Sequence, residues 1–159
     1  MDFVIGLDDP RAEDVQALLD SHLTFSDQVT PPGHVHALDI EGLLDPTVTL
    51  FSARRDGTLL GLAALKRLDS AHAELKSMHT SAAARRQGVG QAMVAYVLDF
   101  AARANYKRVS LETLTMGAFG PARSLYTKAG FVRCKPFGEY TADPCSVCMT
   151  VMLDPPGDD

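Results

Sequence analysis

The chain has 159 residues, 46% of them hydrophobic, and a formal net charge of −5 at pH 7. This length and composition predict one globular domain, over residues 1–154, followed by a flexible tail over 155–159. The negative charge and scattered basic residues argue against a nucleic-acid surface, which needs clustered Lys and Arg. No apolar run reaches the roughly 18–20 residues of a membrane span, and the N-terminus lacks the features of a secretion signal. We therefore expect a cytoplasmic protein without a membrane or nucleic-acid partner.

Turn and capping residues divide the chain into alternating strands and helices. Asp9 and Pro10 are typical of the N-cap and first turn of a helix, and Asp56-Gly57 is typical of a two-residue hairpin. The expected strands cover residues 3–7, 47–54, 58–65, 71–79, 108–114, 131–134 and 146–153, with the three between 47 and 79 forming an antiparallel meander. One expected helix begins at Pro10, and a separate short helix ends near Leu44, after a break in the chain at residues 30–33. Two further helices are expected over 88–104 and 121–129. The apolar stripe expected on the longest helix consists of Val89, Met93, Tyr96, Val97, Phe100 and Ala104.

Two basic residues and two glycines lie between the last meander strand and the longest helix, at residues 85–90 (Arg-Arg-Gln-Gly-Val-Gly). Glycine lets the backbone turn and approach a ligand closely. The first turn of a helix leaves amide N–H groups unpaired, and the macrodipole adds about half a positive charge there. A phosphate or pyrophosphate is therefore the expected ligand. The loop is neither a P-loop nor a dinucleotide fingerprint, because it lacks Gly-Lys-Ser/Thr and has Met93 where a third glycine would stand.

The remaining pattern, Arg-x-x-Gly-x-Gly at residues 85–90, resembles the acetyl-CoA signature of the GNAT N-acetyltransferases. A second stretch, from Leu125-Tyr126 to Gly130-Phe131, resembles the Leu-Tyr-x-x-x-Gly-Phe helix and strand of that family. Residues 74–78, 136–137 and 143–144 resemble its YsnE-like branch. The resemblance implies an α/β (α+β) GNAT fold, with a mixed, mostly antiparallel central sheet of about seven strands flanked by about four helices.

The same resemblance implies an enzyme, an N-acetyltransferase that moves the acetyl group of acetyl-CoA to the amine of a small polar acceptor by direct attack. Backbone amides of the glycine loop would hold the pyrophosphate, and strand residues before the loop would pair with the pantetheine arm. Phe119 stands where the family often has an Asn, so we expect no cofactor contact from that position. The residues expected to bind acetyl-CoA are Met78, His79, Thr80, Arg85, Arg86, Gln87, Gly88, Val89, Gly90 and Gln91.

Acyl transfer to an amine also needs proton transfers. An alkyl amine with a pKa of about 10 is only about 0.1% neutral at pH 7, so a base is useful, directly or through water. Glu74 and Glu112 are the candidates, although Glu74 and Lys76 share a strand face and could form a structural ion pair instead. Tyr126 matches the family tyrosine that protonates the leaving thiolate, and packing within its helix is the alternative role.

Four residues are expected to line the acceptor site. In the resembling family, the segment between the first two helices forms one wall, which makes His36 a candidate. Lys76 adds a charge from the third meander strand. Phe137 and Tyr140 lie on the loop before the last strand and suit either a pocket wall or a contact in a homodimer.

Other functions stay open at this stage. The chain could be an acyl-CoA-binding sensor without turnover, or a protein or peptide N-acetyltransferase, which would need an open groove. Cys145-x-x-Cys148 lacks a second Cys or His pair, so we expect no metal site. With Cys134 the cysteine count is odd, which argues against a disulfide framework.

Overall fold

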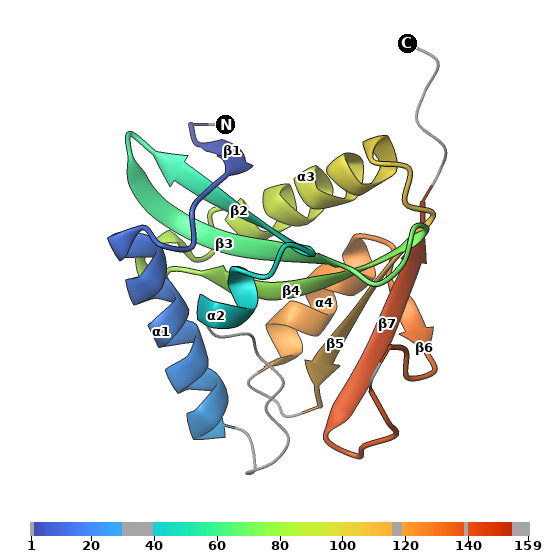
Figure 1. Cartoon of the computed structure of the whole chain (residues 1–159). Coiled ribbons are helices and arrows are strands. Elements are labelled where there is room, and N and C mark those ends of the chain that lie inside the picture. The colour runs from blue at the N-terminus through green and yellow to red at the C-terminus, as the bar shows by residue number, and fades with distance from the viewer. Residues whose placement is uncertain (1, 30–39, 116–118, 139, 154–159) are drawn as a thin grey trace.

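The structure is a computed structural model that describes residues 2–29, 40–115, 119–138 and 140–153 (Figure 1). Within these residues, seven strands form one mixed sheet in the order β1-β2-β3-β4-β5-β7-β6, in which only β4 and β5 pair in parallel. The strands are β1 (Val4–Leu7), β2 (Val48–Arg55), β3 (Thr58–Arg67), β4 (His72–Thr80), β5 (Arg108–Leu114), β6 (Val132–Cys134) and β7 (Ser146–Met152). The helices are α1 (Glu13–Val29), α2 (Ile40–Leu43), α3 (Val89–Arg103) and α4 (Gly120–Lys128), with a 3-10 turn, η1 (Ala82–Ala84), between β4 and α3.

This arrangement confirms the fold expected from the sequence, including the antiparallel meander β2-β3-β4. The start of α1 differs from the expectation: the helix begins at Glu13 and not at Pro10. The reason is a separate turn, in which the Ala12 N–H donates to the Asp9 carbonyl over 3.1 Å and the Arg11 N–H donates to the Asp9 carboxylate over 2.9 Å. The tail predicted over 155–159 lies outside the described residues. Within the described part of the chain, no helix is both long and apolar enough to span a membrane.

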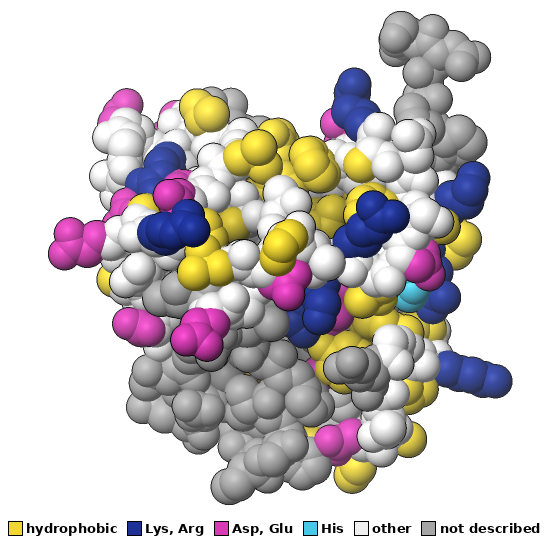
Figure 2. Space-filling view, viewed as in Figure 1, with side chains coloured by type: hydrophobic (Ala, Val, Ile, Leu, Met, Phe, Trp, Pro, Cys, Tyr) yellow, Lys and Arg dark blue, Asp and Glu magenta, His cyan; other side chains and the backbone are white. Residues whose placement is uncertain are grey.

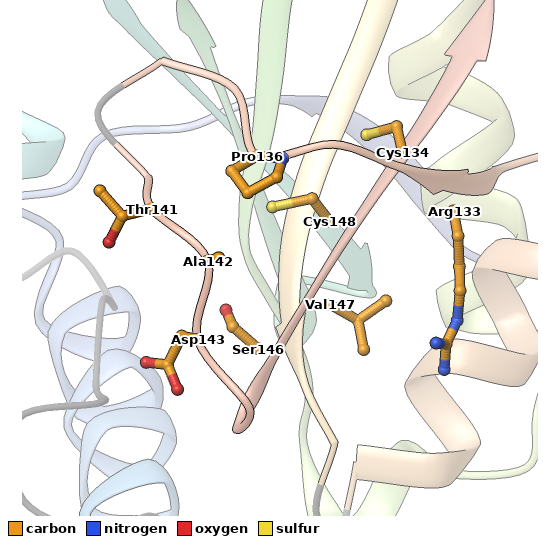
Figure 3. Close-up of a pocket in the computed structure, with 9 residues that line it drawn as sticks. All are labelled: Arg133, Cys134, Pro136, Thr141, Ala142, Asp143, Ser146, Val147 and Cys148. Carbon is orange, nitrogen blue, oxygen red and sulfur yellow. The ribbon is translucent and has the colours of Figure 1, made fainter.

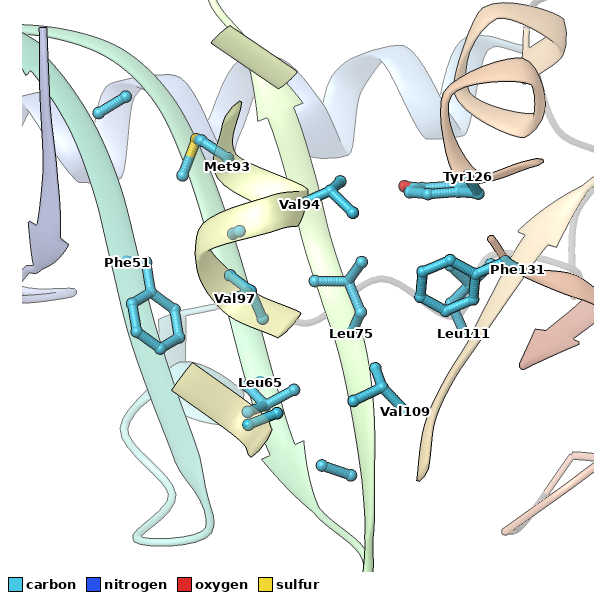
Figure 4. Packing of buried hydrophobic residues seen from close by; sticks show 14 of the residues in the cluster. Phe51, Leu65, Leu75, Met93, Val94, Val97, Val109, Leu111, Tyr126 and Phe131 are labelled. Atoms are coloured by element: carbon cyan, nitrogen blue, oxygen red, sulfur yellow. The ribbon is translucent and has the colours of Figure 1, made fainter. Parts of the chain in front are cut away.

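Helices cover both faces of the sheet (Figure 1). Side chains of α3 and α4 form the larger core with one face, and Figure 4 shows Val94 and Val97 of α3 and Tyr126 of α4 beside Leu75 and Leu111 of the strands. A smaller core joins α1 and α2 to the opposite face of β2 and β3. We call these two faces the α3 side and the α1 side of the sheet.

The buried stripe of α3 differs slightly from the expected one. Val94 and Ala101 are fully buried, whereas Tyr96 is 38% exposed and Ala104 is exposed. The Tyr96 ring instead packs edge-on against Phe51 at the rim of the core, with 5.8 Å between ring centroids. The side chains that point most directly at the sheet are therefore four residues apart: Val89, Met93, Val97 and Ala101.

Strand β3 passes directly under the start of α3 at Gly61. A Cβ at Gly61 would lie 3.1 Å from both the His79 carbonyl oxygen and the Met93 Sδ, and 3.2 Å from the Val89 Cγ1. These separations are tighter than ordinary packing contacts, so the absence of a side chain at Gly61 lets the first turns of α3 approach the sheet closely.

Gly61→Ala is expected to lower the free energy of unfolding by about 1–3 kcal/mol, because the new methyl group must displace packed neighbours. Gly6→Ala is the matched control, since a Cβ at Gly6 would meet no atom within 4 Å. Urea unfolding of both variants measures the difference. Equal stability of the two variants would contradict the close approach of α3 to β3.

Candidate active site

Strands β4 and β5 are paired only at their beginnings. The parallel register joins residues 72–74 to residues 108–110, whereas β4 continues to Thr80 and β5 to Leu114. Pairing between β4 and β3 continues to Thr80. The two central strands therefore diverge in the middle of the sheet, and Figure 1 shows β5 turning away from β4.

A β-bulge in β4 lies just beyond the point where β4 and β5 diverge. The register between β3 and β4 shifts between Leu62 and Ala64, so that Ser77 and Met78 together oppose one residue of β3. Ser77 has φ +57°, and its buried hydroxyl makes no hydrogen bond within the described residues. Positive φ at a residue other than glycine is uncommon and is concentrated at functional sites.

The bulge changes which side chains of β4 share a face. Directly opposed residues of an antiparallel pair point to the same face. His79 opposes Leu62, whose side chain belongs to the core on the α1 side, and Met78 packs against the core on the α3 side. Simple alternation from Lys76 would have placed Met78, and not His79, on the α1 side. The sequence pattern did not reveal this exchange.

The loop between β4 and α3 turns through two residues with positive φ, Arg86 at +64° and Gly88 at +81°. The side chain of Gln87 holds the loop in place, because its Nε2 donates to the Ala83 carbonyl and its Oε1 accepts from Arg55 Nη2, each over 3.0 Å. Among the described residues no side chain caps the start of α3 at Gly88, and Arg85 and Arg86 are exposed. This is the arrangement of backbone amides and positive charge that binds an anionic group.

Gly90 brings the ends of three elements together. A Cβ at Gly90 would lie 3.2 Å from the Leu125 Cδ2 of α4 and 3.8 Å from the Thr80 Oγ1 of β4. The first turn of α3, the end of β4 and the middle of α4 therefore meet at this glycine. A larger residue at Gly90 would press against the Leu125 side chain and force these elements apart.

Helix α4 places Tyr126 on the α3 side of the sheet. Tyr126 is only 7% exposed, and its ring packs against Phe131 with 5.9 Å between centroids. Burial raises the pKa of Tyr126 above its ordinary value, so the hydroxyl stays protonated at neutral pH. Tyr126 therefore contributes to packing, which was one of the two roles expected from the sequence. Its hydroxyl group also stays able to donate a proton or a hydrogen bond.

On the α1 side, three polar side chains meet around one carboxylate. Glu74 is 4% exposed, and its Oε2 accepts hydrogen bonds from the Tyr140 hydroxyl over 2.6 Å and from Lys76 Nζ over 3.2 Å. Lys76 Nζ also donates to the Tyr140 hydroxyl over 2.8 Å. The ion pair that sequence spacing allowed is thus formed, and Tyr140 completes it from the loop between β6 and β7. We call these three residues the Glu74 cluster.

Phe137 anchors the same loop beside the Glu74 cluster. Its ring is 5.2 Å from that of Tyr140 and 5.6 Å from that of His72, centroid to centroid. His72 Nε2 lies 2.7 Å from Ser110 Oγ, and burial, with the charge of Arg108 as a smaller cause, lowers the pKa of His72. His72 is therefore neutral at pH 7, and sequence reasoning missed it because nothing in the local pattern distinguishes it.

Glu112 belongs to the same face as the Glu74 cluster. Ser110 is the parallel register partner of Glu74, and Glu112 follows it by two residues on β5. Burial, and then the charge of Glu74, raise the pKa of Tyr140, and the charge of Glu112 contributes to the same shift. Both candidate bases therefore lie on the α1 side together with Lys76, whereas Tyr126 lies on the α3 side. His36 lies outside the described residues, and the described part of the chain holds no group of three or more His, Cys, Asp or Glu residues placed to bind a metal.

Tyr140→Phe is expected to lower the free energy of unfolding by about 1.5–3 kcal/mol, because Glu74 would lose a donor to a buried carboxylate. Tyr96→Phe is the control, since Tyr96 is 38% exposed and makes its ring contact with Phe51. Thermal and urea unfolding would show the difference. A loss equal to that of Tyr96→Phe would mean that the Glu74 cluster is not formed in solution.

Comparisons with known proteins agree with this geometry. The model of the acetyltransferase (GNAT) family matches residues 13–131. The N-acetyltransferase YsnE of Bacillus subtilis (strain 168) is 42% identical over 149 residues, which cover 94% of this chain and 99% of YsnE. The N-acetyltransferase YedL of Escherichia coli (strain K12) is 40% identical over 151 residues, which cover 95% of each protein.

A solved structure shows the same fold with a ligand. The GNAT family acetyltransferase from Elizabethkingia anophelis, with acetyl-CoA bound, superposes with a TM-score of 0.68 at 18% identity, covering 96% of this chain and 99% of that one. The similarity to YsnE also supports the branch that the sequence motifs indicated. The chain belongs to the GNAT acetyltransferase family, as an N-acetyltransferase that uses acetyl-CoA as the acetyl donor.

Proposed function

We propose that this enzyme acetylates the amine of a small polar acceptor, which attacks the thioester of acetyl-CoA directly. The observation that supports the proposal is the divergence of β4 from β5, which interrupts the sheet between the α3 side, where we place the donor, and the α1 side, where we place the acceptor. Tyr126 lies over the α3 side of these strands (Figure 4), and the Glu74 cluster lies on the α1 side. Acetyl-CoA supplies an activated acyl group, and the residues of the chain must hold it and move two protons.

We assign the donor side to the loop and the end of β4. The uncapped amides at the start of α3 and the exposed Arg85 and Arg86 fit the phosphate groups of coenzyme A. Beyond Glu74, the edge of β4 that faces β5 no longer pairs with it. The amide groups of the pantetheine arm would bind along this edge, at Met78 and Thr80, like an added strand. A Cβ at Gly88 would meet no described atom within 4 Å, which suits the close approach of a ligand to the loop.

Carboxylates and cations are mixed on the α1 side. Glu74 and Glu112 share this face with Lys76 and also with Lys66 and Arg108, which are the register partners of Glu74 and His72. Figure 2 shows acidic and basic side chains mixed over the described surface of one face of the molecule, as suits a small polar ligand. Phe137 and Tyr140 would form the wall of the acceptor site beside these carboxylates.

We assign the base to Glu74 or Glu112, acting directly or through water. Glu74 Oε2 already accepts from Tyr140 and Lys76, so an acceptor amine that bonds to Glu74 would have to share or replace these donors. Glu112 is less buried than Glu74 and lies on the same face. Both carboxylates therefore stay candidates, with Glu74 also serving to position Tyr140 and Lys76.

Tyr126→Phe is expected to lower kcat by about 100-fold, because the protonated hydroxyl would no longer donate to the leaving thiolate. The affinity for acetyl-CoA is expected to stay unchanged. Tyr106→Phe, at the turn between α3 and β5, is the matched control and should turn over normally. Thiol release from acetyl-CoA, measured with a panel of small amines and one peptide with a free N-terminus, gives kcat for each variant.

The panel also separates the proposal from its alternatives. Acetyl-CoA binding without thiol release for any amine would identify a non-catalytic binding protein. Release with the peptide alone would identify a peptide N-acetyltransferase. Equal kcat for Tyr126→Phe and the wild type would remove Tyr126 from the mechanism.

A further inference from the structure

Two cysteines of neighbouring strands are directly opposed. Cys134 of β6 is the register partner of Cys148 of β7 in an antiparallel pair, and both thiols are free. Opposed residues of such a pair have Cα atoms about 4.5–5.5 Å apart and side chains on the same face. A disulfide joins Cα atoms about 4.4–6.8 Å apart, so the backbone already holds these two residues at a bonding separation.

The pair is also reachable. Both cysteines line a pocket of about 220 Å³ between β6, β7 and the loop before β7 (Figure 3), with Pro136, Thr141, Asp143 and Ser146 among its other walls. Cys148 is 8% exposed, and Cys134 is more exposed than Cys148. A small oxidant that enters the pocket therefore meets Cys134 first.

We propose that Cys134 and Cys148 form a redox-active dithiol, which hydrogen peroxide and small hydroperoxides convert into an intramolecular disulfide. The site is separate from the glycine loop and from Tyr126, and the proposal does not depend on the acetyl-transfer reaction. It concerns the segment 135–147, which carries Phe137 and Tyr140.

The reaction proceeds in two balanced steps. The Cys134 thiolate attacks one oxygen of hydrogen peroxide, the O–O bond breaks, and hydroxide leaves while Cys134 becomes a sulfenic acid. The sulfur of Cys148 then attacks the Cys134 sulfur, the S–S bond forms, and the S–O bond breaks to release a second hydroxide. The protons of the two thiols convert both hydroxides to water, so the thiols lose two electrons and the peroxide gains them.

The surroundings assign the order of these steps. Burial, followed by the charge of Cys134, raises the pKa of Cys148 to about 11, which makes Cys148 the weaker initial nucleophile. The backbone N–H of Phe137 donates to the Cys148 thiol, and Glu112 of β5 is the register partner of Cys148 on its other side. The bond would tie both ends of the segment that holds Tyr140 against Glu74.

The test treats the reduced full-length protein with hydrogen peroxide. Of its three thiols, one is expected to remain, with a mass loss of two hydrogens and one crosslinked peptide that joins Cys134 to Cys148. The crosslink closes a loop of about 15 residues, which should raise Tm by roughly 5–10 °C until dithiothreitol reverses it.

Three single variants complete the test. Cys145→Ser is expected to keep the mass loss and the Tm shift, and Cys134→Ser and Cys148→Ser are expected to lose both. If Cys148→Ser does not fold, the test rests on Cys134→Ser, because Cys134 is the more exposed of the two positions. A crosslink through Cys145, a bond between two molecules, or oxidation to sulfinic acid without a disulfide would overturn the proposal.

Discussion

The early end of the pairing between β4 and β5 is the constraint on which the site depends. Backbone N–H and C=O groups of a strand need partners, and a strand that leaves its neighbour turns such groups towards the gap. The bulge at Ser77 accompanies this divergence, and Gly61 and Gly90 allow α3 and α4 to pack closely beside it. We propose that acetyl-CoA, a ligand with amide and phosphate groups, binds along the edge of β4 and at the loop that follows it.

The sheet also separates the two halves of the proposed chemistry. Hydrophobic packing holds Tyr126 on the α3 side, where burial keeps its hydroxyl protonated. On the α1 side, the Glu74 cluster combines a buried carboxylate, an ammonium group and a phenol. A buried carboxylate needs hydrogen-bond donors and an opposite charge, and Tyr140 and Lys76 supply both to Glu74.

Much of the fold follows from local signals in the sequence. Asp56-Gly57 specifies the hairpin, and the periodicity of α3 and the glycine loop specify the unit from β4 to α3. The bulge could not be predicted, because Ser77 adopts a positive φ, a backbone conformation that is expected at glycine and not at serine. The contact of Tyr140 with Glu74 spans 66 residues of sequence, and the opposition of Cys134 and Cys148 depends on strand register; both are set by tertiary packing.

The central claim is that the loop before α3 holds acetyl-CoA. Isothermal titration of the wild type, the double variant Arg85→Ala/Arg86→Ala and the control Arg103→Ala tests it most directly. Arg103 lies at the opposite end of α3, where it pairs with Asp99 at the surface. We expect the wild type and Arg103→Ala to bind equally, and the double variant to lose at least about tenfold in affinity, or about 1.4 kcal/mol. No binding by the wild type, or equal binding by all three proteins, would contradict the account.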